Sequence, residues 1–254
     1  MGAKKRSRRF RRNAGNGSPS AAPLTLLWRF TWRTVLLFLI AVTLLQFWFF
    51  ACVWYWSVYN PGSTAFMRMR LERVREEQPH IGIRYTWVPY RRISAHLKRA
   101  VVAAEDAKFV EHDGFDWDGI RKAYEKNIRE GEVVAGGSTI TQQLAKNLFL
   151  SADRAWWRKA QEAAITVMIE LLMDKRRILE LYLNVIEWGD SVFGAEAAAR
   201  YHYGVSAAEL GPAQAARLAA MVPTPRRYTP GKHTAYLDRR AATILARMNA
   251  VRVP

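Results

Sequence analysis

The sequence predicts a mainly α-helical domain preceded by a single membrane-spanning helix. From Thr34 to Tyr59 the chain has 26 consecutive residues without a formal charge, which is the pattern of a membrane span. The roughly 195 residues that follow are rich in Ala, Leu, Glu, Lys and Arg, and their Gly and Pro residues fall mostly at breaks, as in helical sequences.

The residues before this uncharged stretch are strongly basic. Of the 39 Lys and Arg residues, nine lie in residues 1–33, which contain no Asp or Glu, so the remaining chain has 30 basic and 22 acidic residues. Such a basic run is predicted to be a disordered tail. Because positively charged flanks stay on the cytoplasmic side, we expect residues 1–33 in the cytoplasm and residues 60–254 outside the membrane.

Residues 34–59 exceed the roughly 20 residues that a helix needs to cross the hydrocarbon core, and tilt can absorb the excess. Aromatic residues crowd the second half, as expected at a membrane interface. They are Phe47, Trp48, Phe49, Phe50, Trp54, Tyr55, Trp56 and Tyr59. The alternatives are a soluble core helix and a cleaved signal peptide. A signal peptide has a shorter apolar region and a small-residue cleavage site, so we predict an uncleaved anchor.

The anchor contains Cys52, the one cysteine of the chain. A single cysteine excludes an intramolecular disulfide framework and a Cys-rich metal site.

The outer domain is predicted element by element from breaks and apolar periodicity. Asn-Pro-Gly-Ser at residues 60–63 ends the anchor. Residues 79–90 alternate weakly between apolar and polar and are predicted to be extended. Helices are expected over residues 92–112, 117–130, 139–149, 154–173, 175–184, 191–201, 206–222 and 234–250. A Pro-rich loop, residues 223–231, separates the last two.

Several chemistries are excluded because their motifs are missing. The sequence has no GxxxxGK[ST] phosphate loop, no GxGxxG turn, no HExxH, no CxxC and no GxSxG elbow. It also has no Ser-x-x-Lys, the nucleophile motif of penicillin-binding transpeptidases. The polar chemistry that remains consists of carboxylates, amides, hydroxyls and bases, and it is concentrated in three segments.

The first segment runs from Ala103 to Gly114. On the predicted helix, Glu105, Phe109 and His112 fall at positions i, i+4 and i+7 and share one face. A carboxylate beside apolar groups could act as a general base, because a low local dielectric raises its pKa toward the working pH. The alternative is an ordinary amphipathic helix that ends at the glycine.

The second segment reads Gly-Gly-Ser-Thr-Ile-Thr-Gln-Gln-Leu-Ala-Lys-Asn and is predicted to be a loop that enters a helix. Thr139 and Gln142 have the spacing of a capping box, and Ser138 is an alternative cap. Free backbone N–H groups at such a helix end suit an anion, and Gln143 and Lys146 would add donors from the same side. Capping alone explains the hydroxyl residues but not the number of donors.

The third segment places Arg158 four residues and Lys159 three residues before Glu162. The alternative to a function is a solvated helix ion pair worth a few tenths of a kcal/mol. In a cleft, the same three residues could bind a pyrophosphate, the bases directly and the carboxylate through a divalent cation or by orienting the bases.

Together the three segments resemble the peptidoglycan glycosyltransferases, glycosyltransferase family 51. The motifs that carry the resemblance are Glu-Asp-x-x-Phe-x-x-His-x-Gly from Glu105, GGSTITQQLAKN, and Arg-Lys-x-x-Glu from Arg158. Similarity to later family motifs continues at Ile178–Asn184, Gly189, Phe193, Gly194 and Ala219–Pro230. The resemblance covers about residues 80–230, and it is greatest to the monofunctional members, because no transpeptidase domain follows.

The resemblance implies a lysozyme-like helical domain that polymerises lipid II into β-1,4-linked glycan strands. The implied reaction inverts the anomeric carbon and releases undecaprenyl pyrophosphate, without transpeptidase activity. Glu105 would deprotonate the 4-hydroxyl of the acceptor sugar, and Glu162 would help to stabilise the departing pyrophosphate. The residues implied to bind the substrate or shape its site are Asp106, Phe109, His112, Ser138, Thr139, Gln143, Lys146, Asn147, Arg158 and Lys159.

The implied cofactor is Mg²⁺ or Mn²⁺ held by Glu162 at the pyrophosphate, with no organic cofactor. The implied partners are lipid II, the growing glycan chain, membrane lipids, and penicillin-binding and divisome proteins.

Three other functions compete with this interpretation. Two carboxylates would also suit a lytic glycosidase, although the donor-rich second segment and the bases of the third favour a pyrophosphate leaving group. A catalytically idle scaffold could bind anionic lipid. A nucleic-acid binder fits least, because much of the net charge of +17 lies beside the anchor and no recognition motif is present.

Overall fold

The computed structural model describes residues 22–77, 80, 82–132, 136–149, 156–231 and 234–254. The chain divides into two compact units at Trp48 and Phe49. Most of the predicted basic tail, residues 1–21, lies outside the described residues.

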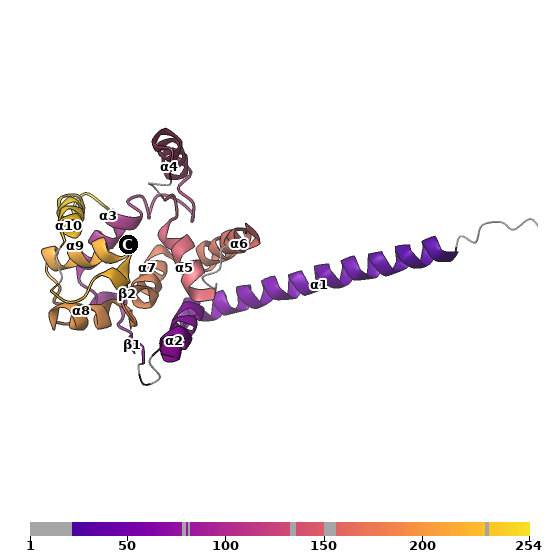
Figure 1. Cartoon of the computed structure of the whole chain (residues 1–254), viewed down its shortest axis with the longest axis horizontal. Helices are drawn as coiled ribbons and strands as arrows, with labels where there is room; N and C mark the ends of the chain where they lie inside the picture. Colours follow the sequence, from indigo (N-terminus) through magenta and orange to yellow (C-terminus); the bar gives the residue numbers. More distant parts are fainter. Residues whose placement is uncertain (1–21, 78–79, 81, 133–135, 150–155, 232–233) are drawn as a thin grey trace, which may run out of the picture. The chain divides into compact units, whose positions relative to one another are not determined.

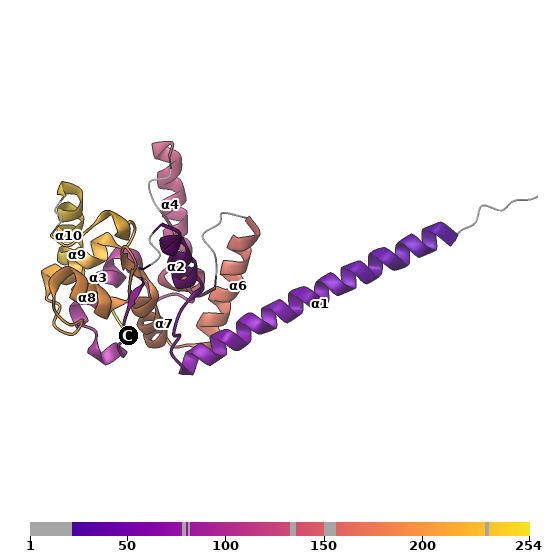
Figure 2. The same cartoon turned by 60° about the horizontal axis from the view of Figure 1, so that its bottom comes forward.

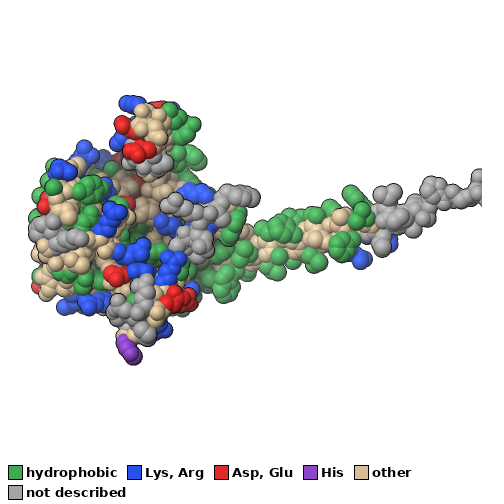
Figure 3. Space-filling view, in the orientation of Figure 1, with side chains coloured by type: hydrophobic (Ala, Val, Ile, Leu, Met, Phe, Trp, Pro, Cys, Tyr) green, Lys and Arg blue, Asp and Glu red, His purple; other side chains and the backbone are tan. Residues whose placement is uncertain are grey.

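Helix α1 (Ala22–Val58) contains the predicted anchor. The helix begins at Ala22, so the prediction that residues 22–33 are disordered is wrong; apolar and aromatic residues with only two arginines extend the helix there. Residues 27–58 are long and apolar enough to cross a membrane, and Leu37 and Phe38 are 66% and 67% exposed. Figure 3 shows hydrophobic side chains along this helix. A core helix of a soluble protein would bury such side chains.

The second unit is mainly α-helical, as predicted (Figure 1). Its elements are α2 (Ala65–Glu77), β1 (Arg84–Tyr85), the 3-10 helix η1 (Tyr90–Arg92), α3 (Ala95–Glu105), α4 (Trp117–Glu130), α5 (Ile140–Phe149), α6 (Trp156–Leu172), α7 (Lys175–Val185), β2 (Glu187–Gly189), β3 (Val192–Phe193), α8 (Ala195–Tyr203), α9 (Pro212–Met221), the 3-10 helix η2 (Pro225–Arg227) and α10 (Ala235–Arg247).

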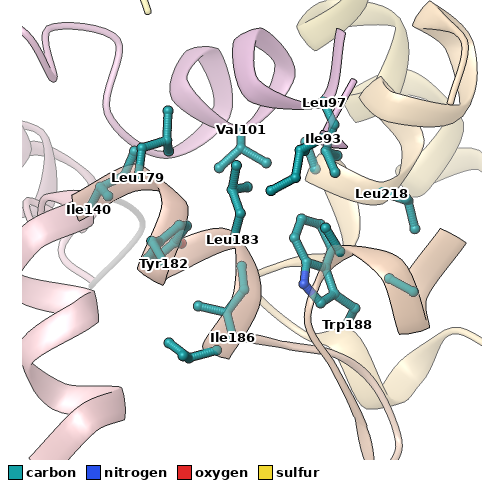
Figure 4. Packing of buried hydrophobic residues seen from close by; sticks show 14 of the residues in the cluster. Ile93, Leu97, Val101, Ile140, Leu179, Tyr182, Leu183, Ile186, Trp188 and Leu218 are labelled. Atoms are coloured by element: carbon teal, nitrogen blue, oxygen red, sulfur yellow. The ribbon is translucent and has the colours of Figure 1, made fainter. Parts of the chain in front are cut away.

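The helices pack in two groups around one core. Helices α3, α9 and α10 pack on one another, while α5 packs against α2, α6 and α7 (Figures 1 and 2). Buried side chains from both groups meet around α7, where Figure 4 shows Tyr182 and Leu183 among the apolar residues of α3 and α5. Helix α7 therefore joins the two groups.

The predicted elements differ from the observed ones in several places. The helix expected over 92–112 ends at Glu105, and the helix expected from residue 206 begins only at Pro212. Helix α2 and strand β2 were not predicted, and β3 lies where a helix over 191–201 was expected, so that α8 begins only at Ala195. Strand β1 falls within residues 79–90, which were predicted to be extended. Strands β1 and β2 flank β3, parallel and antiparallel to it respectively. Strands of two or three residues are too short to show an alternating pattern.

Asn184 fixes the chain that runs into α3. Its side-chain amide accepts from the backbone N–H of Val88 at 2.9 Å and donates to the backbone oxygens of Val88, at 2.9 Å, and Glu180, at 2.8 Å. Its side chain is fully buried, so these contacts replace water for the extended segment that precedes η1.

We expect Asn184→Ala to lower the free energy of unfolding by about 2–4 kcal/mol, because buried polar groups of Val88 lose their partner. The measurement is thermal unfolding of the full chain in detergent. Asn249→Ala, at an exposed position, is the matched control and should leave the midpoint unchanged. Equal midpoints for the two variants would contradict the assigned role.

Candidate active site

Glu105 is the last residue of α3 and lies against α5. Its Oε2 accepts a hydrogen bond from Nε2 of Gln143 at 2.9 Å. Its Oε1 is buried without a hydrogen-bond partner, and Nη2 of Arg240 lies 3.7 Å from it. One carboxylate oxygen is therefore held by a hydrogen bond, while the other has only the contact with Arg240.

The surroundings of Glu105 raise the pKa of its carboxyl group. Burial is the largest cause, and the neighbouring carboxylate of Asp106 adds to it. The hydrogen bond from Gln143 and the charges of Arg240 and Lys146 act in the opposite direction. Burial prevails because it disfavours the charged form, which is the condition for a general base that works near neutral pH.

Gln143 is oriented by a second contact. Its Oε1 accepts a hydrogen bond from the hydroxyl of Tyr182 at 2.8 Å, so its amide nitrogen faces Glu105. Complete burial raises the pKa of Tyr182 well above its usual value, which keeps this hydroxyl a donor.

The prediction that Glu105, Phe109 and His112 share one helix face is wrong. Helix α3 ends at Glu105 because the next carboxylate, that of Asp106, bonds elsewhere. Its oxygens lie 2.9 and 3.1 Å from Nε2 of His112, and Oδ2 accepts from the backbone N–H of Ile140 at 3.1 Å. Side-chain bonds of this kind compete with helix continuation.

The other residues of the first segment support the site from behind. Asp106 is 7% exposed and Phe109 has no exposed surface, so their side chains position the turn and have no free surface for a substrate. Lys175 lies over the ring of Phe109 and donates to the backbone oxygen of His112. These contacts hold the turn that follows Glu105, which fits residues that shape the site.

The predicted capping box of α5 is present. The backbone N–H of Thr139 donates to Oε1 of Gln142 at 3.0 Å, and the N–H of Gln142 donates to Oγ1 of Thr139 at 3.3 Å. Thr139 is buried, whereas Ser138 is exposed. The expected anion site at this helix end is occupied by the protein itself, because the carboxylate of Asp106 bonds to Ile140 there.

A cavity of about 510 Å³ brings together four of the predicted substrate-binding residues, Gln143, Lys146, Asn147 and Arg158. The other lining residues are Phe66, Ile186, Glu187, Val222, Pro223, Pro225 and Arg226. Gln143 both lines this cavity and donates to Glu105, so the cationic cavity and the buried carboxylate adjoin.

The third segment lies on α6, next to this cavity. Lys159 forms an ion pair with Glu162, whose side chain is 10% exposed while that of Lys159 is 59% exposed. The pair is therefore not a fully solvated surface contact. Arg158 lines the cavity, whereas Lys159 does not line it and pairs with Glu162. The two basic residues of the segment therefore have different surroundings.

Sequence reasoning missed Glu187 and Arg226. Glu187 is 7% exposed, and its carboxylate lies 3.3 Å from Arg70 and 3.7 Å from Arg226. Burial raises the pKa of Glu187, against the effect of both arginines. The only signal in the sequence was the Pro-rich loop that carries Arg226, since the contacts join segments far apart in the chain.

No group of three or more His, Cys, Asp or Glu residues that could hold a metal is found among the described residues. Glu162 is thus not part of a complete metal site made by these residues. It can still serve as a single ligand, because Mg²⁺ is commonly held by one or two carboxylates together with substrate phosphates.

The sequence model of the family described as Transglycosylase matches residues 74–249. A biosynthetic peptidoglycan transglycosylase of Nitrosospira multiformis is 57% identical over 89% of this chain and 98% of its own length. The protein of the same name from Methylobacillus flagellatus is 59% identical over 88% of this chain and 97% of its own length. The one from Azoarcus sp. is 62% identical over 80% and 87%.

The environment of Glu105 predicts a stability difference that depends on pH. A carboxyl group whose folded pKa is raised favours folding below its unfolded pKa, and this contribution is lost as the pH rises through the folded pKa. We therefore expect Glu105→Gln to unfold at a higher temperature than the parent protein at pH 8. A gain of 1 kcal/mol would raise the midpoint by about 2–4 °C.

The difference in unfolding temperature between the variant and the parent should disappear as the pH falls toward 4, where the parent carboxyl group is protonated in the folded and the unfolded state. The measurement is thermal unfolding in detergent across this range. Glu130→Gln, at an exposed position on α4, is the control and should show no such difference. A parent protein that is the more stable one at pH 8 would contradict the assignment.

Proposed function

The chain belongs to the transglycosylase family, and we propose that its cavity and Glu105 together carry out glycosyl transfer from a lipid-linked pyrophosphate. Its activity is that of a peptidoglycan glycosyltransferase, which polymerises glycan chains in cell-wall synthesis, and the transglycosylase domain is a lysozyme-like helical fold. The observation that carries the proposal is the buried, half-satisfied carboxylate of Glu105 beside a cavity lined by Lys146, Arg158 and Arg226.

In the proposed reaction, Glu105 takes the proton from the 4-hydroxyl of the acceptor lipid II. The oxygen then attacks the anomeric carbon of the growing chain, and the bond from that carbon to the pyrophosphate oxygen breaks. The electron pair leaves with undecaprenyl pyrophosphate, and attack opposite to the leaving group inverts the anomeric carbon. Oε1 of Glu105 has no hydrogen-bond partner and lies 3.7 Å from Nη2 of Arg240, and the raised pKa of the carboxyl group suits it to receive the proton.

The pyrophosphate is proposed to lie against the cations of the cavity. Lys146 and Arg158 extend from α5 and α6 into it, and Arg226 enters from η2. Cations fixed by the fold stabilise charge as it develops on the leaving group. Glu187 supports this arrangement, because it lies 3.7 Å from Arg226 and anchors it at the cavity wall.

The contacts of Glu162 favour a transferase over a lytic glycosidase. A hydrolase of this type needs a second carboxyl group that donates a proton to the leaving group. An apolar environment around that group keeps it protonated. Glu162 is instead paired with Lys159. We propose that it orients the bases and, where Mg²⁺ or Mn²⁺ takes part, is the protein carboxylate that binds the ion. Such an ion would neutralise charge on the pyrophosphate.

We also propose that α1 crosses the cytoplasmic membrane once, with the basic tail inside and the domain outside. The nine cations of residues 1–33 and the uncharged stretch behind them support this orientation. Lipid-linked precursors exposed on the outer face would then reach the domain. Penicillin-binding and divisome proteins are proposed as partners, because uncross-linked glycan is the material that they would act on.

We expect Glu105→Gln to reduce polymerisation of lipid II by about 10²–10⁴-fold, the usual contribution of a general base. The assay gives lipid II to the full chain in detergent and follows polymeric glycan that lysozyme digests. Binding of lipid II should persist in the variant, and Glu130→Gln is the control.

Retained turnover in Glu105→Gln would remove Glu105 as the base. Shortening of preformed glycan by the parent protein, without polymerisation, would favour the glycosidase, and binding alone would favour the scaffold.

The hydrogen bond from Gln143 predicts a shift in the pH profile. Because this bond lowers the pKa of Glu105, Gln143→Leu should raise that pKa and move the acidic limb of kcat/KM to higher pH. Tyr182→Phe removes only the contact that orients Gln143, so the acidic limb of kcat/KM should move less in this variant than in Gln143→Leu. An acidic limb that moves to lower pH in Gln143→Leu would contradict the proposed contact.

A further inference from the structure

A second basic cavity, of about 380 Å³, lies between η1 and the first turns of α7. Its lining residues are Pro89, Tyr90, Arg91, Asp174, Arg176, Arg177 and Glu180. It shares no lining residue with the cavity beside Glu105. Nothing in the proposed glycosyl transfer uses it.

The acidic residues of this cavity are already engaged. Glu180 accepts from Nη1 of Arg177 at 2.7 Å and from the backbone N–H of Tyr90, also at 2.7 Å. Asp174 caps α7 by accepting from the backbone N–H of Arg177 at 2.7 Å. Both carboxylates are therefore held by the protein and leave the remaining cations uncompensated.

Arg91 and Arg176 form no ion pair with any described residue, and both are exposed. Arg176 lies 5.2 Å from the centre of the Tyr90 ring, and the ammonium group of Lys98 lies 4.0 Å from the same centre. Burial and then the charge of Arg176 lower the pKa of Lys98, which reflects the repulsion between cations held close together. An anion in the cavity would relieve this repulsion.

The place of the cavity is fixed by Arg177. Its Nη2 donates to the backbone oxygens of Trp56, at 2.9 Å, and Tyr59, at 2.7 Å, and its Nε donates to Trp56 at 3.1 Å. These carbonyls lie at the end of α1, where Trp54 and Tyr55 are exposed as in an interfacial aromatic belt. The same arginine lines the cavity, so the cavity lies at the level of the lipid headgroups if α1 spans the membrane.

We propose that this cavity binds the phosphate of an anionic phospholipid headgroup in the outer leaflet, beside the end of the anchor. The proposal rests on the membrane orientation given under the proposed function. Arg91 and Arg176 would contact the phosphate oxygens, because guanidinium groups bind phosphate in a planar, two-pronged geometry. A lipid is favoured over a free ion since the membrane supplies the headgroup at high local concentration next to Arg177.

The test uses the full chain in nanodiscs of phosphatidylcholine, alone or in equal parts with phosphatidylglycerol. Native mass spectrometry counts the phosphatidylglycerol molecules that the released protein retains. We expect the double variant Arg91→Gln/Arg176→Gln to lose about 10–30-fold in phosphatidylglycerol affinity, the effect of two basic side chains near the surface. Arg91→Lys/Arg176→Lys keeps the charge and should lose less.

The matched control is Arg239→Gln/Arg247→Gln on α10, which removes the same charge away from this cavity. Unchanged retention in the first double variant, or an equal loss in the control, would overturn the proposal. So would inorganic phosphate that displaces phosphatidylglycerol at comparable concentration, because the cavity would then be a site for free phosphate.

Failure of this proposal can be told apart from failure of the proposed function. Polymerisation of lipid II in detergent without phospholipid should persist in Arg91→Gln/Arg176→Gln. A parent protein that retains phosphatidylglycerol but does not polymerise would overturn only the proposed function. Loss of polymerisation in the double variant with unchanged lipid retention would overturn the lipid site.

Discussion

The carboxylate of Asp106 is the contact on which the candidate active site depends. It joins His112 to the N-terminus of α5 through Ile140, and it is nearly inaccessible to solvent. One side chain thereby ends α3, closes the turn that follows and caps the next helix. Because Glu105 immediately precedes Asp106 and Gln143 lies one turn into α5, the same contact brings these two functional side chains together. Loss of the contact would release the turn as well as Glu105.

The site separates two electrostatic requirements that a glycosyl transfer imposes. A base near neutral pH needs desolvation, and burial supplies it to Glu105, the proposed base. A pyrophosphate leaving group needs cations, and Lys146, Arg158 and Arg226 line the neighbouring cavity. Arg240 and Lys146 already lower the pKa of Glu105, although burial prevails, and cations packed more closely on it would weaken it as the proposed base. Gln143 touches both environments and, as a neutral donor, orients the carboxylate with a smaller effect on its pKa.

Features that depend on residues within one helical turn could be predicted from the sequence. Features that depend on contacts between distant segments could not. The capping box of Thr139 and Gln142 and the Lys159–Glu162 pair follow from spacing within one turn, which sequence shows directly. The end of α3 could not be predicted, because it depends on a bond from Asp106 to a residue 34 positions later. Glu187 escaped notice for the same reason: its burial and its partners Arg70 and Arg226 exist only after the chain has folded.

Helix α7 connects the end of α1 with the candidate active site. In its first turn, Arg177 bonds to the carbonyls at the end of α1, and further along Tyr182 orients Gln143. These two residues are five apart, so they are separated by about 7.5 Å along the helix axis. A helix that holds both contacts fixes the distance between the end of α1 and Glu105, the proposed base. Under the proposed function, the lipid-linked pyrophosphate must reach this site from the membrane, so a fixed distance from the end of α1 would serve the reaction.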